Sequence, residues 1–100
     1  KDTNIATVAC GYADGYPVSL SNKAKVIIKN KFFNLVGRVC MDHIMVDLGN
    51  KTAFLGDEVI LIGKDKNLVI KVEDISKIAN TIPYEIVSRL SLKIPRIYKT

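Results

Sequence analysis

The chain has 100 residues, of which 48% are hydrophobic and 25% are charged. This length and balance are typical of one globular domain, residues 1–100, and exclude a disordered chain or a collagen-like repeat. Its purely apolar runs are short, as at residues 59–62, whereas a membrane-spanning helix needs roughly 20 apolar residues. We therefore expect a folded domain with no membrane partner.

The charge balance is basic, with 15 Lys and Arg residues against 10 Asp and Glu residues and a net charge of +5. A basic surface can bind anionic partners such as nucleic acids. Most of the basic residues are lysines scattered along the chain, and only residues 23–31 approach a cluster. Arginine, which contacts phosphates and bases better than lysine does, is rare. We expect a solvated lysine-rich surface and no nucleic-acid partner; a small basic β-barrel binding module is the alternative.

The two cysteines, Cys10 and Cys40, are too far apart in sequence to form a CxxC pair, and the chain has a single histidine. These residues do not provide the ligands of a zinc site, so we expect no metal site. Reduced thiols and a cytoplasmic location are the default expectation. The chain begins at Lys1 without a signal peptide and without Met, and we expect it to be a piece of a longer protein.

The first third of the chain predicts strands. Residues 5–10 form a short apolar run that ends at a glycine, as a buried strand does. Residues 11–22 are rich in Gly, Pro, Ser, Asp and Asn and predict a loop. Residues 24–29 and 31–36 then predict a β-hairpin, with Asn30 in its tight turn.

Three more strands follow. Residues 43–48 alternate, with Met45 and Asp47 on the face opposite three aliphatic side chains, which indicates a half-buried strand. Residues 58–62 and 68–72 predict further short strands between glycine-containing turns. Turns every eight to twelve residues or so favour a small sandwich or barrel.

The apolar period becomes helical near Val72, and two acidic residues lie in the first turn of the predicted helix. Asn80 is the predicted end of this helix. A second short helix is predicted to begin near Pro83, because proline is tolerated in a first turn. Residues 94–98 predict a last strand at a sheet edge, because Pro95 cannot donate a ladder hydrogen bond.

Two segments contain residues suited to ligand binding. Residues 11–17, GYADGYP, permit a backbone bend that either presents the Tyr12 phenol to a ligand or forms a surface turn. Residues 37–42, GRVCMD, make a poor core strand. They either offer backbone N–H groups and a charge to an anion, or hold an Arg38–Asp42 surface pair beside two buried sulfur residues.

A third segment, residues 81–85, places Tyr84 in the first turn of the second predicted helix. Helix N-termini attract phosphates, so this tyrosine either hydrogen-bonds a phosphate or caps and packs the helix. The lone His43 has no accompanying nucleophile motif, and we interpret it as a structural or surface histidine.

Taken together and in order, these segments resemble the C-terminal domain of the alanine racemases. The resemblance covers essentially the whole chain, and each segment is weak by itself. The matching segments are residues 11–17, 20–22, 37–42, 47–48, 56–59, 81–85 and 95–98.

The resemblance implies a mainly β fold: a small Greek-key-like β-barrel with one or two short helices near the C-terminus. It also implies a longer enzyme that interconverts L- and D-alanine with pyridoxal phosphate for peptidoglycan synthesis. In that family an N-terminal α/β barrel holds the cofactor on a lysine, and a homodimer builds each site from the barrel of one protomer and this domain of the other. Both catalytic bases, that lysine and an upstream tyrosine, lie outside this chain, so no catalytic residue is expected here and the isolated chain is expected to be inactive. A racemase of another small amino acid, such as serine, is an alternative.

The resemblance also implies roles for individual residues. Met41 corresponds to the residue whose backbone N–H binds the substrate carboxylate, and Tyr84 to a tyrosine that hydrogen-bonds the cofactor phosphate. The candidates for the substrate entrance are Tyr12, Arg38, Asp42 and Ile82. Two positions depart from the family pattern, because Val18 and Lys93 stand where many relatives have arginine. The first departure puts the charge that lines the entrance in doubt.

Overall fold

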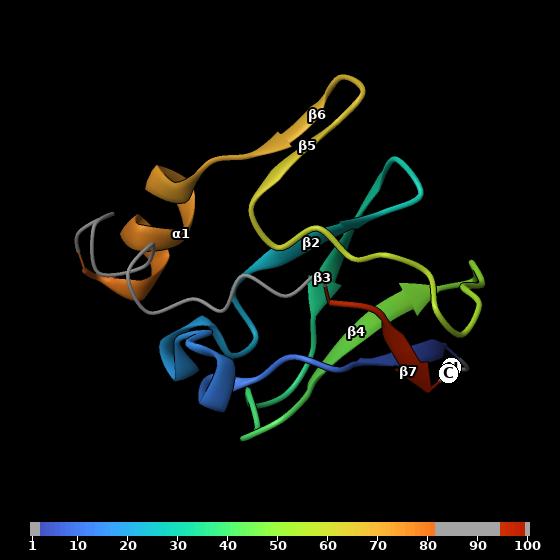
Figure 1. Cartoon of the computed structure of the whole chain (residues 1–100), viewed down its shortest axis with the longest axis horizontal. Coiled ribbons are helices and arrows are strands. Elements are labelled where there is room, and N and C mark those ends of the chain that lie inside the picture. Colours follow the sequence, from blue (N-terminus) through green and yellow to red (C-terminus); the bar gives the residue numbers. More distant parts are fainter. Residues whose placement is uncertain (1–2, 82–94, 100) are drawn as a thin grey trace.

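The structure, a computed structural model, describes residues 3–81 and 95–99. Its main feature is a five-stranded antiparallel sheet with the order β2-β3-β4-β1-β7 (Figure 1). Strands β2, β3 and β4 follow one another, and β1 reaches the far side of β4 through a long connection, which is the Greek-key arrangement. The strands are β1 (Asn4–Val8), β2 (Lys25–Ile28), β3 (Lys31–Leu35), β4 (Ile44–Gly49) and β7 (Ile97–Lys99). The predicted mainly β fold is confirmed.

The predicted hairpin is β2 and β3, with Ile28 paired to Lys31 across the turn. Lys29 and Asn30 occupy the turn with φ of 49° and 61°. Two successive positive φ values are typical of a type I′ turn, whose twist matches that of the strands it joins.

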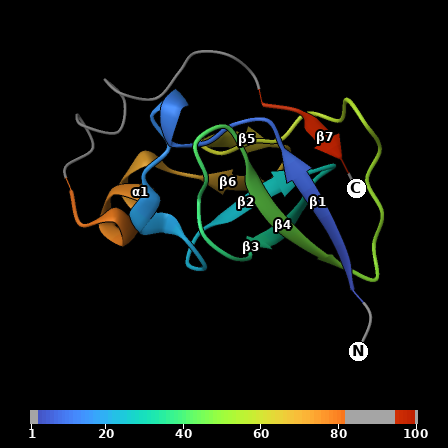
Figure 2. The ribbon, with the colours of Figure 1, turned by 90° about the horizontal axis from the view of Figure 1, so that it is seen from below.

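Strands β1 and β4 lie side by side at the centre of the sheet, with β7 on the other side of β1 (Figure 2). Alternate residues of both strands are buried, so the predicted two-faced pattern of β4 is confirmed, with Met45 and Asp47 opposite the buried aliphatic face. The core gathers side chains from almost every element. Its largest fully buried members are Tyr16, Leu20, Ile27, Ile28, Ile44, Ile75, Val8, Val26, Val39, Val46 and Val59.

The two edges of this sheet are joined by residues 56–60. Ile60 exchanges two hydrogen bonds with Ile27 of β2, at 2.9 and 3.0 Å. On the other side, Gly56 donates to Ile97 of β7 at 2.9 Å, and Ile97 donates to Asp57 at 2.8 Å. The predicted strand over residues 58–62 is therefore wrong. Glu58 pairs with Arg96, next to β7, and Ile60 pairs with Ile27 of β2, so the segment forms isolated bridges instead of a ladder. It closes the sheet towards a barrel.

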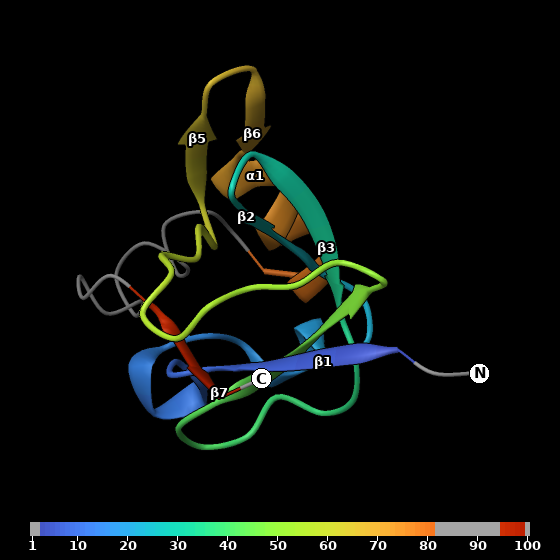
Figure 3. The same ribbon diagram turned by 90° about the vertical axis from the view of Figure 1, so that its right-hand side faces the viewer.

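A second, two-stranded sheet projects from the main sheet (Figure 3). It pairs β5 (Gly63–Asp65) with β6 (Leu68–Ile70), which is shorter than the predicted strand because Val72 already begins the helix. Strand β5 was not predicted, because its sequence, Gly-Lys-Asp, carries no apolar alternation.

Helix α1 (Val72–Ala79) is confirmed, and it ends at Asn80 with φ of 58°, in the left-handed conformation that asparagine tolerates. It packs beside the short 3-10 helix η2 (Val18–Leu20). The second predicted helix, near Pro83, lies outside the described residues. The last strand is confirmed as β7, at the edge of the five-stranded ladder. Among the described residues, no helix is long and apolar enough to cross a membrane.

Candidate functional site

The segment 37–42 leaves β3 and enters β4 without belonging to either strand. It starts at Gly37, whose φ of 80° allows the chain to turn away from β3. Val39 is buried and anchors the segment in the core, whereas Arg38, Met41 and Asp42 are exposed. The segment is therefore outside the sheet ladders, which agrees with its prediction as a poor core strand.

A second loop packs directly against this segment. The 3-10 helix η1 (Tyr12–Asp14) follows β1 at the same end of the sheet. The Tyr12 N–H donates to the Cys40 carbonyl oxygen at 2.9 Å, and the Ala13 N–H donates to the Met41 carbonyl oxygen at 2.8 Å. Two motifs that are far apart in sequence are thus joined backbone to backbone.

Gly11 makes this contact possible. A Cβ atom at this position would lie 2.2 Å from the Cys40 carbonyl oxygen and 2.6 Å from the Met41 carbonyl oxygen. From the sequence, the glycines of this loop are predicted only to permit a bend of the backbone. The close approach gave no signal in the sequence beyond a glycine directly before Tyr12, because the partner residues are 29 and 30 positions away.

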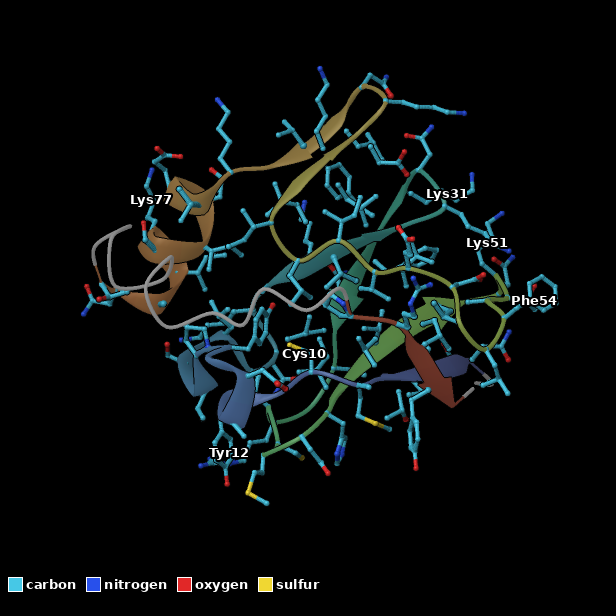
Figure 4. All side chains as sticks on the ribbon, in the orientation of Figure 1. Cys10, Tyr12, Lys31, Lys51, Phe54 and Lys77 are labelled. Atoms are coloured by element: carbon cyan, nitrogen blue, oxygen red, sulfur yellow. The ribbon has the colours of Figure 1, made fainter. Side chains whose placement is uncertain are left out.

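The Met41 N–H finds no acceptor within residues 3–81 and 95–99. The neighbouring Cys40 N–H, in contrast, donates to the His43 carbonyl oxygen at 3.0 Å. Met41 is 57% exposed and Tyr12 is 48% exposed, and Figure 4 shows Tyr12 projecting outward at one end of the molecule. This end of the sheet therefore carries an available backbone donor and an exposed phenol on two loops that are bonded to each other.

Asp42 is paired with His43 and not, among the described residues, with Arg38. Its Oδ1 lies 2.9 Å from the His43 Nδ1. This hydrogen bond lowers the pKa of the Asp42 carboxyl group below its ordinary value. The alternative of an Arg38–Asp42 pair is wrong, and the surface position predicted for the histidine is supported by its partly exposed side chain.

Asp42 and His43 also line an open hollow of about 380 Å³ beside η1. The other walls of the hollow are Ala9, Ala13, Asp14 and Tyr98. Of the candidate entrance residues, the structure brings Tyr12, Arg38 and Asp42 to the two joined loops. Ile82 and Tyr84 lie outside the described residues.

The described lysines do not form one basic face. Lys31 and Lys51 lie at one side of the molecule and Lys77 at the other (Figure 4). Lys29 is already engaged, because its Nζ is 3.3 Å from Asp57 and 4.3 Å from the centroid of the Phe54 ring. This distribution supports a solvated basic surface and gives the nucleic-acid alternative no continuous stripe.

The two cysteines differ in burial. Neither Cys10 nor Cys40 is in a disulfide, and Cys10 is buried. Within the described part of the chain no group of three or more His, Cys, Asp or Glu residues could hold a metal ion. Cys40 is only partly buried.

These features define a small mainly β domain with a donor-bearing loop pair at one end of its sheet. Residues 1–98 match the family model described as "Alanine racemase, C-terminal domain". The chain belongs to this family.

Curated relatives agree with this assignment. The chain is 51% identical over 100 residues to an alanine racemase of Clostridium perfringens, a match that covers 99% of this chain and 26% of that protein. It is 50% identical over 95 residues to alanine racemase 2 of Bacillus subtilis, covering 94% of this chain and 24% of that protein. The chain thus spans about a quarter of the length of these relatives.

Solved structures show the same fold. The alanine racemase of Bacillus anthracis with bound L-Ala-P superposes with a TM-score of 0.85 at 37% identity, over 100% of this chain and 25% of that one. The alanine racemase of Bartonella henselae with covalently bound pyridoxal phosphate superposes with a TM-score of 0.78 at 40% identity, over 89% of this chain and 25% of that one.

Proposed function

We propose that this chain is the C-terminal domain of an alanine racemase that interconverts L- and D-alanine with pyridoxal phosphate. In the complete protein an N-terminal α/β barrel precedes this domain, and two protomers form a homodimer. Each active site then lies between the barrel of one protomer and this domain of the other. Support comes from the family match over residues 1–98 and from relatives about four times longer than the chain.

One observation supports a role for a particular residue in this proposal. The Met41 N–H has no acceptor among the described residues. Alanine is small, and its carboxylate must be held still while the Cα proton is exchanged. A backbone N–H can hold an anion in a fixed direction without the entropy cost of ordering a long side chain. The Met41 N–H is the proposed donor to the substrate carboxylate, and the Tyr12 phenol is proposed to line the entrance together with Arg38, Asp42 and Ile82.

The cofactor, when bound, supplies the electron-withdrawing group that acidifies the Cα proton of the substrate. This chain contributes binding and orientation, not the bases. Tyr84 is proposed to hydrogen-bond the cofactor phosphate, and Met41 to orient the carboxylate. With both bases outside the chain, the purified 100-residue chain is expected to show no racemase activity.

The proposed setting is the cytoplasm, where the product D-alanine supplies peptidoglycan synthesis for the cell wall. Two thiols without a disulfide suit a reducing compartment.

The test compares Met41→Pro with Met41→Leu in the full-length protein. Proline removes the N–H, whereas leucine keeps it and approximates the side-chain volume. We expect the KM for L-alanine to rise much more in Met41→Pro than in Met41→Leu. Because proline also restricts the backbone, an ester in place of the amide at residue 41 gives a second way to remove the N–H. Equal KM values for L-alanine in Met41→Pro, Met41→Leu and the ester variant would exclude this role.

Substrate choice is tested in the same assay. Comparable or faster turnover of L-serine would assign the enzyme to another small amino acid. Tight, steeply salt-dependent binding of the chain to nucleic acid would instead favour the basic binding module.

A further inference from the structure

The residues Leu20-Ser21-Asn22 belong to the matched motifs, but the proposed function gives them no role. Leu20 ends η2, and Ser21 and Asn22 follow it next to the segment 37–42. The Gly37 N–H donates to the Asn22 Oδ1 at 2.6 Å. The Val39 N–H donates to the Ser21 Oγ at 2.8 Å. Two consecutive side chains thus bind alternate backbone amides of the segment that carries Met41.

Each of these side chains is itself held in place. The Ser21 hydroxyl donates to the Val18 carbonyl oxygen at 2.6 Å, so its proton is used and its lone pairs face Val39. Asn22 has φ of 61°, a conformation that asparagine adopts more readily than most residues. Leu20, directly before the pair, is fully buried and ties it to the core.

The opposite flank of the segment is bound by η1. The Cys40 and Met41 carbonyl oxygens accept the N–H groups of Tyr12 and Ala13. Backbone groups on both sides of the Met41 N–H are therefore bonded, while this N–H has no acceptor in the described part of the chain. The direction of the Met41 N–H follows from how the segment is held at its two flanks.

We infer that Ser21 and Asn22 are positioning residues for the Met41 N–H, acting through their hydrogen bonds to Val39 and Gly37. The inference rests on the proposed function, in which that N–H binds the substrate carboxylate. In this role the two side chains act through the segment 37–42 and not by binding the substrate or the cofactor themselves. They fix the start of the segment, so the Met41 N–H already has its binding direction before each substrate molecule arrives. A rigid anion site needs this preorganisation.

The test uses Asn22→Gly and Asn22→Asp in the full-length protein. Glycine adopts the left-handed conformation without strain and removes the acceptor oxygen. Aspartate keeps both an acceptor oxygen and tolerance of that conformation. Hydrogen–deuterium exchange of the peptide that spans residues 36–43 is measured together with the KM and kcat for L-alanine.

We expect Asn22→Gly to speed exchange at the Gly37 amide by up to about tenfold, since one hydrogen bond is lost. The KM for L-alanine should rise by a similar factor, with a smaller change in kcat, and Asn22→Asp should restore both values. Ser21→Ala, which removes the acceptor for the Val39 amide, should act in the same direction. It serves as the second variant if Asn22→Gly folds poorly.

Unchanged exchange in Asn22→Gly and Ser21→Ala would overturn the inference. Faster exchange together with a KM for L-alanine equal to that of the parent protein would overturn it too. The proposed function fails separately, when Met41→Pro leaves the KM unchanged. A raised KM in Met41→Pro together with a parent KM in Asn22→Gly would therefore reject the positioning role alone.

Discussion

A Cβ atom at Gly11 would lie 2.2 Å from the carbonyl oxygen of Cys40, closer than any real Cβ contact allows. The conformation of Gly11 does not itself demand glycine, because its φ is −147°. The absence of a side chain is needed for space alone. The backbone of the loop that carries Tyr12 touches the backbone of the segment that carries Met41.

Gly11→Ala should therefore destabilise the protein by about 1–3 kcal/mol, the usual cost of inserting a methyl group into a packed site. The atoms in its way belong to the backbone and cannot move aside as a flexible side chain would. Urea unfolding measures the loss. Gly56→Ala is the control, since no atom lies within 4 Å of its Cβ position and only its φ of 87° opposes the change. A smaller loss of unfolding free energy in Gly11→Ala than in Gly56→Ala would contradict this explanation.

A substitution in the turn between β2 and β3 is expected to stabilise the protein. Asn30 has φ of 61°, and its Oδ1 is buried without a hydrogen-bond partner. Asn30→Gly fits the type I′ turn and removes the unsatisfied oxygen, so the free energy of unfolding should rise, by about 0.5–1 kcal/mol. Asn30→Val, with a β-branched side chain at positive φ, should lower it by about 1–3 kcal/mol. Thermal unfolding of both variants checks the sign, and the reverse order would reject the turn assignment.

A hydrogen bond beside the start of β1 is expected to make the stability of the fold depend on pH. The Thr3 hydroxyl donates to the Asp47 Oδ1 at 2.6 Å, and this bond, followed by that from the Gly49 N–H, lowers the pKa of Asp47. A carboxyl group with a lowered folded-state pKa stabilises the fold above its unfolded pKa, and this contribution is lost as the pH falls through the folded value. Thr3→Val should therefore raise the pKa of Asp47 and shrink this contribution.

Carbon-detected NMR titration of the side-chain carboxyl groups measures the change in the pKa of Asp47. Asp42 is the internal control, because its lowered pKa depends on His43 and not on Thr3. An unmoved Asp47 titration in Thr3→Val would show that the hydroxyl does not stabilise the carboxylate in solution.

Cofactor affinity tests the role proposed for Tyr84. Tyr84→Phe in the full-length protein removes one hydrogen bond to a charged phosphate, which costs about 1.5–3 kcal/mol, or roughly tenfold to a hundredfold in Kd. Absorbance titration of the apoenzyme with pyridoxal phosphate gives this value. Tyr12→Phe, at the proposed substrate entrance, should leave the Kd for the cofactor unchanged. An unchanged Kd in Tyr84→Phe would leave Tyr84 without a role in phosphate binding.

Local features of the fold could be predicted from the sequence. The β2–β3 turn, the alternation in β4 and the end of α1 at Asn80 each depend on the conformational preferences and periodicity of neighbouring residues. The three motifs could also be recognised as a set, because their order and residue types are written in the chain. Strand β5 escaped prediction, since its three residues carry neither alternation nor β-branched side chains.

Contacts between distant residues were decided only by the tertiary structure. Residues 56–60 divide their hydrogen bonds between β2 and β7, Gly11 makes room for Cys40, and Asn22 binds Gly37. No period or local preference specifies which amide meets which oxygen across 15 to 41 positions, because these pairs form only when the whole core packs. The sequence by itself determined the family and most of the strands; packing determined that the backbone of the loop that carries Tyr12 bonds to the segment that carries Met41.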